Sequence, residues 1–232
     1  MLEKILAEHA GFERIIRSKK PFKKLDFTAN NLDLVNRNLT ETTDFADYVF
    51  KEMLADNTAI GIGGYGEDRI IYRQRKHFSQ DLENPRSIHL GTDIWAAAGE
   101  PIYAPLDGIV HSFAFNDHYG DYGPTIILQH ELAGITFFTL YGHLSLASLT
   151  GLHKGKTFKA GQPLATIGPY PENGDWPQHL HFQVIKDMGH YIGDFPGVSS
   201  TQDLAHYLAL CPDPNLILRI VENETPITSD ES

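Results

Sequence analysis

The chain has 232 residues, and 41% of them are hydrophobic, which is enough for one medium domain with an appendage or for two small domains. Its 30 acidic residues exceed the 19 lysines and arginines, so the formal net charge is −11. This charge makes nucleic acid and anionic membrane surfaces poor partners, and the single cysteine, Cys211, excludes an internal disulfide.

Residues 1–58 are predicted to form an N-terminal helical segment. Apolar residues from Leu2 to Ile16 recur at spacings of three and four, and Pro21 ends this stretch. A second helix is expected to begin at Thr42 or Thr43, either of which is a suitable N-cap, and to run through Met53. We see no signal-peptide pattern and no apolar stretch of membrane-spanning length, so the sequence predicts a cytoplasmic protein.

From residue 59 the chain changes to short apolar runs separated by Gly, Pro, Asn and Asp, a pattern typical of strands. The predicted strands are 70–72, 101–104, 108–113, 125–128, 135–141 and 179–185, followed by a short helix over 202–210. So many short strands favour an antiparallel β-sandwich or barrel. The predicted fold is therefore mainly β with N-terminal helices, an α+β class, with a β-rich domain over 59–222 and a polar tail over 223–232.

The first candidate site is His89-Leu90-Gly91-Thr92-Asp93. In a straight strand these two polar side chains would be roughly 13 Å apart, too far to share a metal ion. Gly91 permits a bend or bulge that would bring them together. Alone the cluster is weak evidence, because His and Asp beside a glycine often only form a turn.

The second candidate site is His179-Leu180-His181-Phe182. Residues two apart on a strand share a face, so both imidazoles point one way while Leu180 and Phe182 enter the core. Such a pair favours metal binding or catalysis over two solvated surface histidines. The spacing does not say which histidine would bind a metal ion.

A third histidine, His143, follows an apolar strand in Tyr141-Gly142-His143-Leu144. A lone histidine there is more often a hydrogen-bonded core or turn residue than a catalytic residue. Taken together, however, the three segments supply four imidazoles and a carboxylate. This donor set suits zinc with an open coordination position.

Two competing motifs lack the context that they need. The run from Gly61 to Gly66 matches G-x-G-x-x-G, but it follows a helical stretch and leads into strands, so it is interpreted as a flexible connection. His130-Glu131 begins like the zinc motif H-E-x-x-H, but Gly134 stands in place of the second histidine. Cys211 precedes a proline at a predicted helix end, which indicates a small buried residue rather than a nucleophile.

Between about residues 87 and 186 the chain resembles the M23 family of metallopeptidases, the lysostaphin-like or LytM-type peptidoglycan endopeptidases. The family's H-x-x-x-D, Tyr-x-His-Leu and H-x-H motifs occur in order, at His89 to Asp93, at Tyr141 to Leu144 and at His179 to His181. Glycine-turn segments at 105–110 and 159–164 are similar to those of the family as well.

The resemblance implies a β-sandwich of the duplicated-hybrid-motif type with a substrate groove. It makes His89, Asp93 and His181 the ligands of a Zn²⁺ cofactor, and His143 and His179 the unligated catalytic histidines. It implies a zinc metallo-endopeptidase that hydrolyses peptide bonds in peptidoglycan-derived or other short peptides. Water activated by zinc would attack the carbonyl, and His143 or His179 would accept its proton.

Residues 168–178 depart from the small-residue stretch that usually precedes H-x-H, because they include Trp176 and three prolines. This bulkier segment is expected to reshape the groove beside the catalytic strand. With Cys211-Pro212-Asp213 downstream, the chain also resembles M23-like domains fused to aminotransferases. Asn30 or Asn31 is a further candidate, as a latency ligand to the zinc.

Two other functions are open. A non-catalytic zinc or small-ligand module could keep the M23 fold, although the presence of all five site residues favours the enzyme. A lipoyl or biotinyl carrier would need a modifiable lysine at an exposed hairpin tip within a family motif, and we find none.

Overall fold

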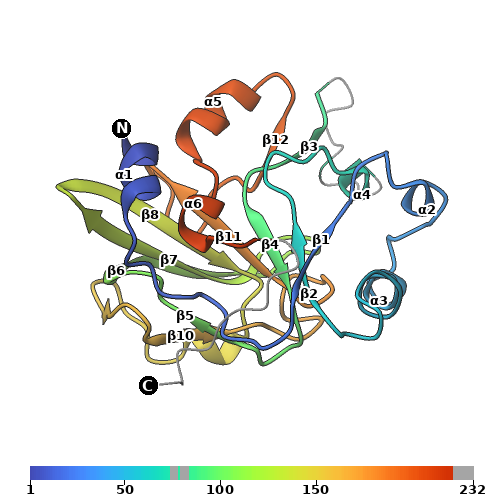
Figure 1. Ribbon diagram of the computed structural model, residues 1–232, viewed down its shortest axis with the longest axis horizontal. Coiled ribbons are helices and arrows are strands. Elements are labelled where there is room, and N and C mark those ends of the chain that lie inside the picture. Colours follow the sequence, from blue (N-terminus) through green and yellow to red (C-terminus); the bar gives the residue numbers. More distant parts are fainter. Residues whose placement is uncertain (74–77, 79–83, 222–232) are drawn as a thin grey trace.

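The computed structural model describes residues 1–73, 78 and 84–221 of the chain (Figure 1). The helical elements are α1 (Leu2–Glu8), α2 (Leu32–Val35), α3 (Thr42–Asp47), the π-helix η1 (Tyr48–Met53), α4 (Ile70–Arg73), the 3₁₀-helix η2 (Leu146–Leu149), α5 (Leu204–Leu210) and α6 (Asn215–Leu218). The strands are β1 (Phe22–Leu25), β2 (Ile60–Gly63), β3 (Arg86–His89), β4 (Thr92–Trp95), β5 (Pro101–Tyr103), β6 (Gly108–Asn116), β7 (Gly123–Leu132), β8 (Ile135–Gly142), β9 (Thr157–Phe158), β10 (Pro163–Thr166), β11 (Leu180–Ile185) and β12 (Val198–Ser200).

An eight-stranded sheet forms the body of the fold, in the order β1-β2-β4-β11-β8-β7-β6-β9 (Figure 1). The pair β1–β2 is parallel and the other pairs are antiparallel. Two small sheets, β10-β5 and β12-β3, accompany it. The predicted mainly β class with N-terminal helices is therefore confirmed.

The longest hairpin shows how the sequence specifies the sheet. Strands β7 and β8 are joined by Ala133 and Gly134, both with positive φ (50° and 75°). This two-residue turn has the positive φ angles of a type I′ turn, whose twist matches that of the paired strands. It sets the register that places Leu132 opposite Ile135 and Ile126 opposite Tyr141.

Both faces of the large sheet are buried. Along β7, Ile126 and Leu128 enter one apolar cluster and Ile127 enters another on the opposite face. Strand β11 alternates in the same way between Val184 and Ile185. Because successive side chains point to opposite faces, burial on both sides explains why these strands are almost continuously apolar. Strands β5 and β10 cover one face as a second layer through Ile102 and Leu164.

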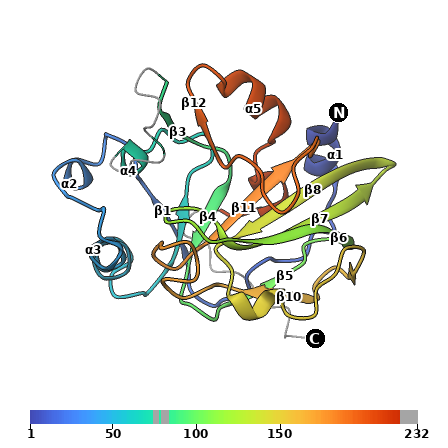
Figure 2. The same ribbon diagram turned by 180° about the vertical axis from the view of Figure 1, so that it is seen from behind.

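The N-terminal segment packs on the rest of the molecule. Helix α1 contributes Leu2 and Leu6 to the cluster on one face of the sheet. Helix α3 and η1 contribute Phe45 and Val49 to a separate cluster that includes Trp95 of β4. Figures 1 and 2 both show α2, α3 and α4 at the β1–β2 end of the large sheet, away from β6 and β7.

The expected helix at the start of the chain is shorter than its apolar pattern. Helix α1 ends at Glu8, although Ile15 and Ile16 are buried in the same cluster. Gly11 follows the helix end, and glycine is a poor helix former. The second helix lies where predicted, but its N-cap is Glu41, and Thr42 donates to the Asp175 carbonyl instead (2.6 Å). Strand β1 lies within residues 1–58 and was not predicted.

Two further predictions were wrong. The run 70–72 is the short helix α4, not a strand, because three apolar residues do not distinguish a strand from one buried helical turn. The glycine-rich run that was interpreted as a flexible connection overlaps strand β2, which ends at Gly63. A Cβ atom on Gly61 would lie 2.6 Å from Leu25 and 3.0 Å from Trp95, so this glycine permits a close approach between neighbouring strands.

The predicted strands 101–104, 108–113, 125–128, 135–141 and 179–185 all correspond to observed strands, and the helix over 202–210 corresponds to α5. The predicted tail 223–232 lies outside the described residues, and the domain boundaries at 58 and 222 stay predictions. Within the described residues no helix is both long and apolar enough to cross a membrane. The cytoplasmic location stays a prediction.

Candidate active site

The chain bends sharply between His89 and Asp93. His89 ends β3, which pairs with β12, whereas Asp93 lies on β4 between β2 and β11. The break at Leu90-Gly91 brings His89 Nε2 to 3.2 Å from Asp93 Oδ1. A Cβ atom on Gly91 would lie 2.6 Å from the His181 ring and 2.8 Å from the Phe182 carbonyl. Glycine is therefore needed here for space.

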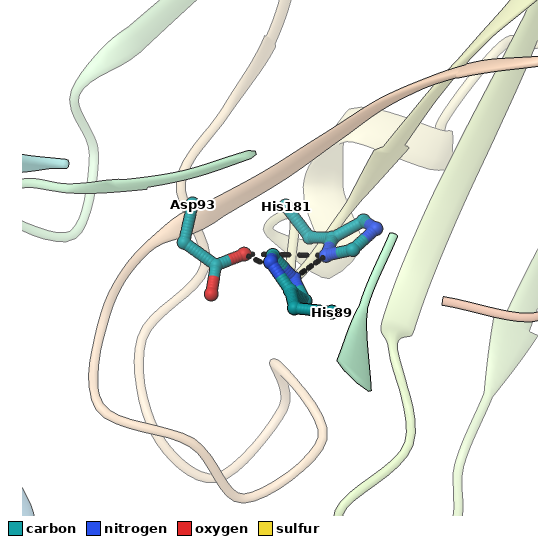
Figure 3. Close-up of side chains that lie close together, drawn as sticks. All are labelled: His89, Asp93 and His181. Carbon is teal, nitrogen blue, oxygen red and sulfur yellow. Dashed lines mark hydrogen bonds and ion pairs between the residues drawn. The ribbon is translucent and has the colours of Figure 1, made fainter. Parts of the chain in front are cut away.

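His181 completes a cluster of three candidate ligands, shown in Figure 3. The register of β11 places His181 directly opposite Asp93. Its Nδ1 atom lies 3.2 Å from Asp93 Oδ1 and 2.9 Å from His89 Nε2. All three side chains are buried, and their ligand atoms lie within 4.8 Å of one another.

This cluster fits a zinc ion in its donor types and its spacing. Two imidazole nitrogens and one carboxylate oxygen are common zinc ligands, and three protein ligands leave a position for water or substrate. Tetrahedral ligands with bonds near 2.0–2.1 Å are about 3.3 Å apart. The observed separations of 2.9 to 3.2 Å are close to that value.

Hydrogen bonds fix the orientation of both candidate imidazole ligands. His89 Nδ1 lies 3.0 Å from the Gly64 carbonyl, so it donates there and leaves Nε2 as an acceptor. His181 Nε2 lies 2.8 Å from Gln183 Oε1, so Nδ1 is left for the metal. The Gln183 amide donates to the Pro196 carbonyl (3.1 Å), which sets the direction of its oxygen. Such outer contacts hold metal-binding histidines in one tautomer.

The Asp93 carboxylate is divided between two partners. Its Oδ1 atom faces the two histidines, and its Oδ2 atom accepts from Arg69 Nη1 at 2.5 Å. Burial by itself would raise the pKa of Asp93. The neighbouring His89 and Arg69 outweigh this effect and hold the pKa well below its usual range. The carboxylate is therefore ionised at neutral pH.

His143 and His179 form a pair beside the candidate ligands, with ring centroids 4.2 Å apart. His143 Nδ1 bonds to the Asn173 carbonyl (2.8 Å) and His179 Nδ1 to the Pro177 carbonyl (2.7 Å). Burial lowers the pKa of His179 to about 4 and holds that of His143 well below its usual value. Both rings are therefore neutral at pH 7, with Nε2 as a proton acceptor.

The backbone holds His143 in an unusual conformation. Its φ is +60°, in the left-handed region that few residues other than glycine adopt. Its amide donates to the Tyr122 carbonyl (2.7 Å), and its carbonyl accepts from Gly168 (2.9 Å). These bonds hold the ring over His179, which stacks on Trp95 at 4.2 Å. Residues strained in this way are concentrated at functional sites.

A cavity of about 430 Å³ opens beside His143 and His181. Its other lining residues include the aromatic residues Tyr72, Tyr122, Trp176 and Phe195 and the charged residues Arg86, Asp121 and Asp194. Trp176, from the unusual segment 168–178, is buried with its ring centroid 6.2 Å from that of His143 and 6.3 Å from that of His179. Trp176 therefore lines the cavity, and the expectation that this segment reshapes the groove stays a prediction.

All five residues proposed from the motifs come together here, but several neighbours were missed. Gln183 could have been found, because it lies two residues after His181 on the same face of β11. Glu67 and Arg69 carried no recognisable pattern, whereas Gly64 and Tyr72 lay in runs that were interpreted as a flexible connection and as a strand.

Some other candidates lie elsewhere. Asn31 caps α2 by accepting from the Leu34 amide (3.3 Å), and Asn30 is exposed, so neither is placed as a zinc ligand. Cys211 is buried, and this burial raises the pKa of its thiol to about 12, as expected for a structural cysteine.

The β-rich fold thus holds a buried His-Asp-His cluster, which is a candidate site for a single metal ion, beside two neutral histidines. Residues 87–192 match peptidase family M23. This part of the chain is therefore similar to peptidase family M23, a family of peptide-bond hydrolases, as its motifs predicted. The resemblance to aminotransferase-fused domains stays a prediction.

One curated relative is the peptidoglycan DD-endopeptidase ShyC of Vibrio cholerae, which is 30% identical over 111 residues. The match covers 44% of this chain and 23% of that protein, so the chain spans about a quarter of its length. A zinc-containing peptidase from Vibrio cholerae is a similar solved structure, with 27% identity, 42% and 27% coverage of the two chains and a TM-score of 0.31. The catalytic domain of lysostaphin from Staphylococcus simulans has 23% identity, 52% and 80% coverage and a TM-score of 0.37.

Proposed function

We propose that the chain is a zinc-dependent metallo-endopeptidase that hydrolyses peptide bonds in peptidoglycan-derived or other short peptides. The observation that carries this proposal is the convergence of His89, Asp93 and His181, whose ligand atoms face one another beside the neutral His143 and His179. The family match and the DD-endopeptidase relative support peptide-bond hydrolysis as the reaction.

His89 Nε2, His181 Nδ1 and Asp93 Oδ1 would hold the ion. When bound, zinc supplies a Lewis acid that polarises a peptide carbonyl and makes water more acidic. The remaining nitrogens of the two histidines hold the ligands in place through Gly64 and Gln183. Such outer contacts would keep both imidazoles oriented toward the ion.

His143 and His179 would move the protons of the reaction. Each ring presents Nε2 as a free acceptor, because its Nδ1–H is committed to a backbone carbonyl. Either ring can take a proton from the attacking water and return it to the leaving amine. The carbonyl partners of Nδ1 stabilise the positive charge while a ring is protonated.

The cavity beside His143 would hold the peptide. Its aromatic walls provide apolar surface, and Arg86, Asp121 and Asp194 provide charges of both signs. A cavity of about 430 Å³ is of the size that accommodates a small ligand or a few residues of a peptide. We therefore favour short peptides or peptidoglycan stem peptides as substrates.

The test is a cleavage assay on cross-linked peptidoglycan fragments and unrelated short peptides, with products identified by mass spectrometry. We expect cleavage that stops when a chelator removes the metal and returns when one equivalent of zinc is added. Zinc-loaded protein that cleaves nothing in this panel would contradict the peptidase and favour a non-catalytic zinc-binding module. A panel of both substrate kinds also separates peptidoglycan specificity from general endopeptidase activity.

A further inference from the structure

We propose that Arg69 is a positioning residue of the metal site, which fixes the Asp93 carboxylate so that Oδ1 faces the metal and Oδ2 is held away from it. The inference rests on the zinc-binding part of the proposed function. It does not depend on which peptide, if any, is cleaved.

Arg69 contacts four groups through its guanidinium, one of which is the Gly64 carbonyl, which accepts from Nη2 at 3.5 Å. Nη1 donates to Asp93 Oδ2 (2.5 Å) and to the Tyr72 hydroxyl (3.1 Å). Nε donates to Glu67 Oε2 at 2.8 Å. Because the guanidinium is planar and its donors are rigidly spaced, contacts at both ends fix its orientation.

The partners of Arg69 are themselves anchored. Glu67 accepts from the backbone amides of Phe27 (3.2 Å) and Gly64 (3.3 Å). The side chains of Arg69, Glu67 and Asp93 are 1%, 8% and 2% exposed, so these charges lie out of water. Buried charges of this kind persist only when they are paired and hydrogen-bonded. The hydrogen bonds of Glu67 thus hold Arg69, which in turn holds the Asp93 carboxylate.

The strand beside Asp93 is built to admit this arginine. Gly63 of β2 lies directly opposite Asp93 of β4. A Cβ atom on Gly63 would lie 2.5 Å from Arg69 Nη2, so a larger residue would displace the guanidinium. The next residue, Gly64, provides the carbonyl that orients His89. The same few residues thus orient two of the three candidate ligands.

Arg69 and the residues that hold it precede the part of the chain that matches the peptidase family, which begins at residue 87. Gly63, Gly64, Glu67, Arg69 and Tyr72 belong to β2, α4 and the segment that joins them. We infer that this segment completes the metal site. It is more than a covering layer.

The charges allow a sharp experiment. Glu67, Arg69 and Asp93 together carry a net charge of −1. Replacing both Glu67 and Arg69 by Gln keeps that value, so a change in metal affinity then reports lost positioning instead of altered charge. Arg69→Lys keeps the charge as well, but it loses the planar fork that reaches Glu67 and Asp93 together. Arg73→Lys is the matched control, since Arg73 bonds an exposed carboxylate, Asp68, at the surface.

The affinity of the full chain for zinc is measured by competition with a chromophoric chelator, and the visible spectrum of the cobalt(II) form is recorded. We expect zinc affinity to fall roughly 10- to 100-fold in Arg69→Lys and in the Glu67→Gln/Arg69→Gln variant. The cobalt bands should change because the carboxylate is free to rotate. Arg73→Lys should bind zinc as the wild type does and give the same spectrum. A merely structural role would lower the melting temperature but leave the spectrum unchanged.

Zinc affinities within threefold of wild type together with an unchanged cobalt spectrum would overturn the proposal. Tyr72→Phe provides a second variant that keeps the ring and removes only the hydroxyl bonded to Nη1. The proposal can therefore still be tested if the arginine variants do not fold. We expect a smaller loss of affinity in that variant, and no loss in it would count against the proposal. Wild-type protein that binds zinc tightly but cleaves nothing would contradict the peptidase alone, whereas wild-type protein that binds no zinc would overturn both.

Discussion

Burial keeps several histidines of this chain neutral, at the site and away from it. Burial lowers the pKa of His89 to about 3 and that of His179 to about 4. A neutral imidazole is what a metal ligand or a proton acceptor requires. The same physical effect therefore prepares both kinds of residue for their proposed roles.

His130 is outside the site, and it provides a test of how burial affects stability. It bonds to the Asp107 carbonyl (2.9 Å) and to the Thr139 hydroxyl (2.7 Å), and burial lowers its pKa from 6.5 to about 4. As the pH falls below 6.5, His130 becomes protonated in the unfolded chain before it does in the folded chain. The free energy of unfolding therefore decreases between about pH 6.5 and pH 4. The loss is about 1.4 kcal/mol per pH unit, or roughly 2 kcal/mol between pH 6.5 and pH 5.

Replacing His130 by Gln should remove this part of the pH dependence. Urea unfolding at pH 7 and pH 5, with chelator present throughout, gives the free energy of unfolding for both proteins. The wild type should lose roughly 2 kcal/mol more than His130→Gln over this interval. The other buried histidines are common to both proteins and cancel in the comparison. Equal losses would show that the pKa of His130 is not lowered.

The motifs predicted the five candidate site residues that come together in the fold but missed the neighbours that contact them. His89, Asp93, His143, His179 and His181 were found because their types and spacings are unusual. Arg69 was not, since a buried arginine and a surface arginine look the same in a sequence. Its position depends on Gly63 and Glu67, whose contacts exist only in the folded chain.

At the scale of elements, strand β11 organises the site by lying between β4 and β8. Its register sets His181 opposite Asp93 on one side and opposite Gly142, the neighbour of His143, on the other. Three motifs that are far apart in the sequence meet for this reason.

The bend between β3 and β4 can be tested at Gly91. In Gly91→Ala the new Cβ atom would collide with the His181 ring and with the Phe182 carbonyl, and a backbone atom cannot move cheaply. We expect a destabilisation of about 1–3 kcal/mol and a loss of zinc affinity of about tenfold or more. Chemical denaturation and zinc titration measure the two effects.

Gly11→Ala serves as the control for this prediction, because Gly11 is exposed and its Cβ atom would meet only the His9 ring, at 3.2 Å from Nε2. It should change neither quantity appreciably. Unaltered zinc affinity in Gly91→Ala would mean that the bend does not need this glycine.

The sequence predicted strands well where an apolar run ends in a turn residue. Strands β7 and β8 are examples, because Ala133-Gly134 separates two long apolar runs. It failed at β1 and β2, where charged residues and glycines conceal the strand pattern. Strand β2 is held by its neighbours β1 and β4, so tertiary pairing overrides a low intrinsic preference.

At the scale of the whole molecule, the N-terminal residues and the family-matched region form one structure. Strands β1 and β2 extend the sheet beside β4, and Phe27, Phe45 and Trp95 pack together in one cluster. The candidate metal site lies where these parts meet.

Metal binding should therefore stabilise the whole fold. An ion that binds only the folded chain adds about 2.7 kcal/mol at a free concentration of 100 times Kd. For a chain of this size that corresponds to a rise in melting temperature of roughly 5–10 °C. Thermal unfolding with zinc and with chelator measures it. His181→Ala should show no such rise, and a full rise in that variant would place the zinc elsewhere.

The most direct test of the account measures zinc per chain and peptide cleavage on the same samples of wild type, His181→Ala and His143→Ala. We expect one zinc per chain with chelator-sensitive cleavage in the wild type, and neither zinc nor cleavage in His181→Ala. His143→Ala should keep its zinc and lose cleavage by about 100-fold or more, because it removes a proton acceptor but no ligand. Full zinc content in His181→Ala, or normal cleavage by His143→Ala, would contradict the assignment of ligands and catalytic histidines.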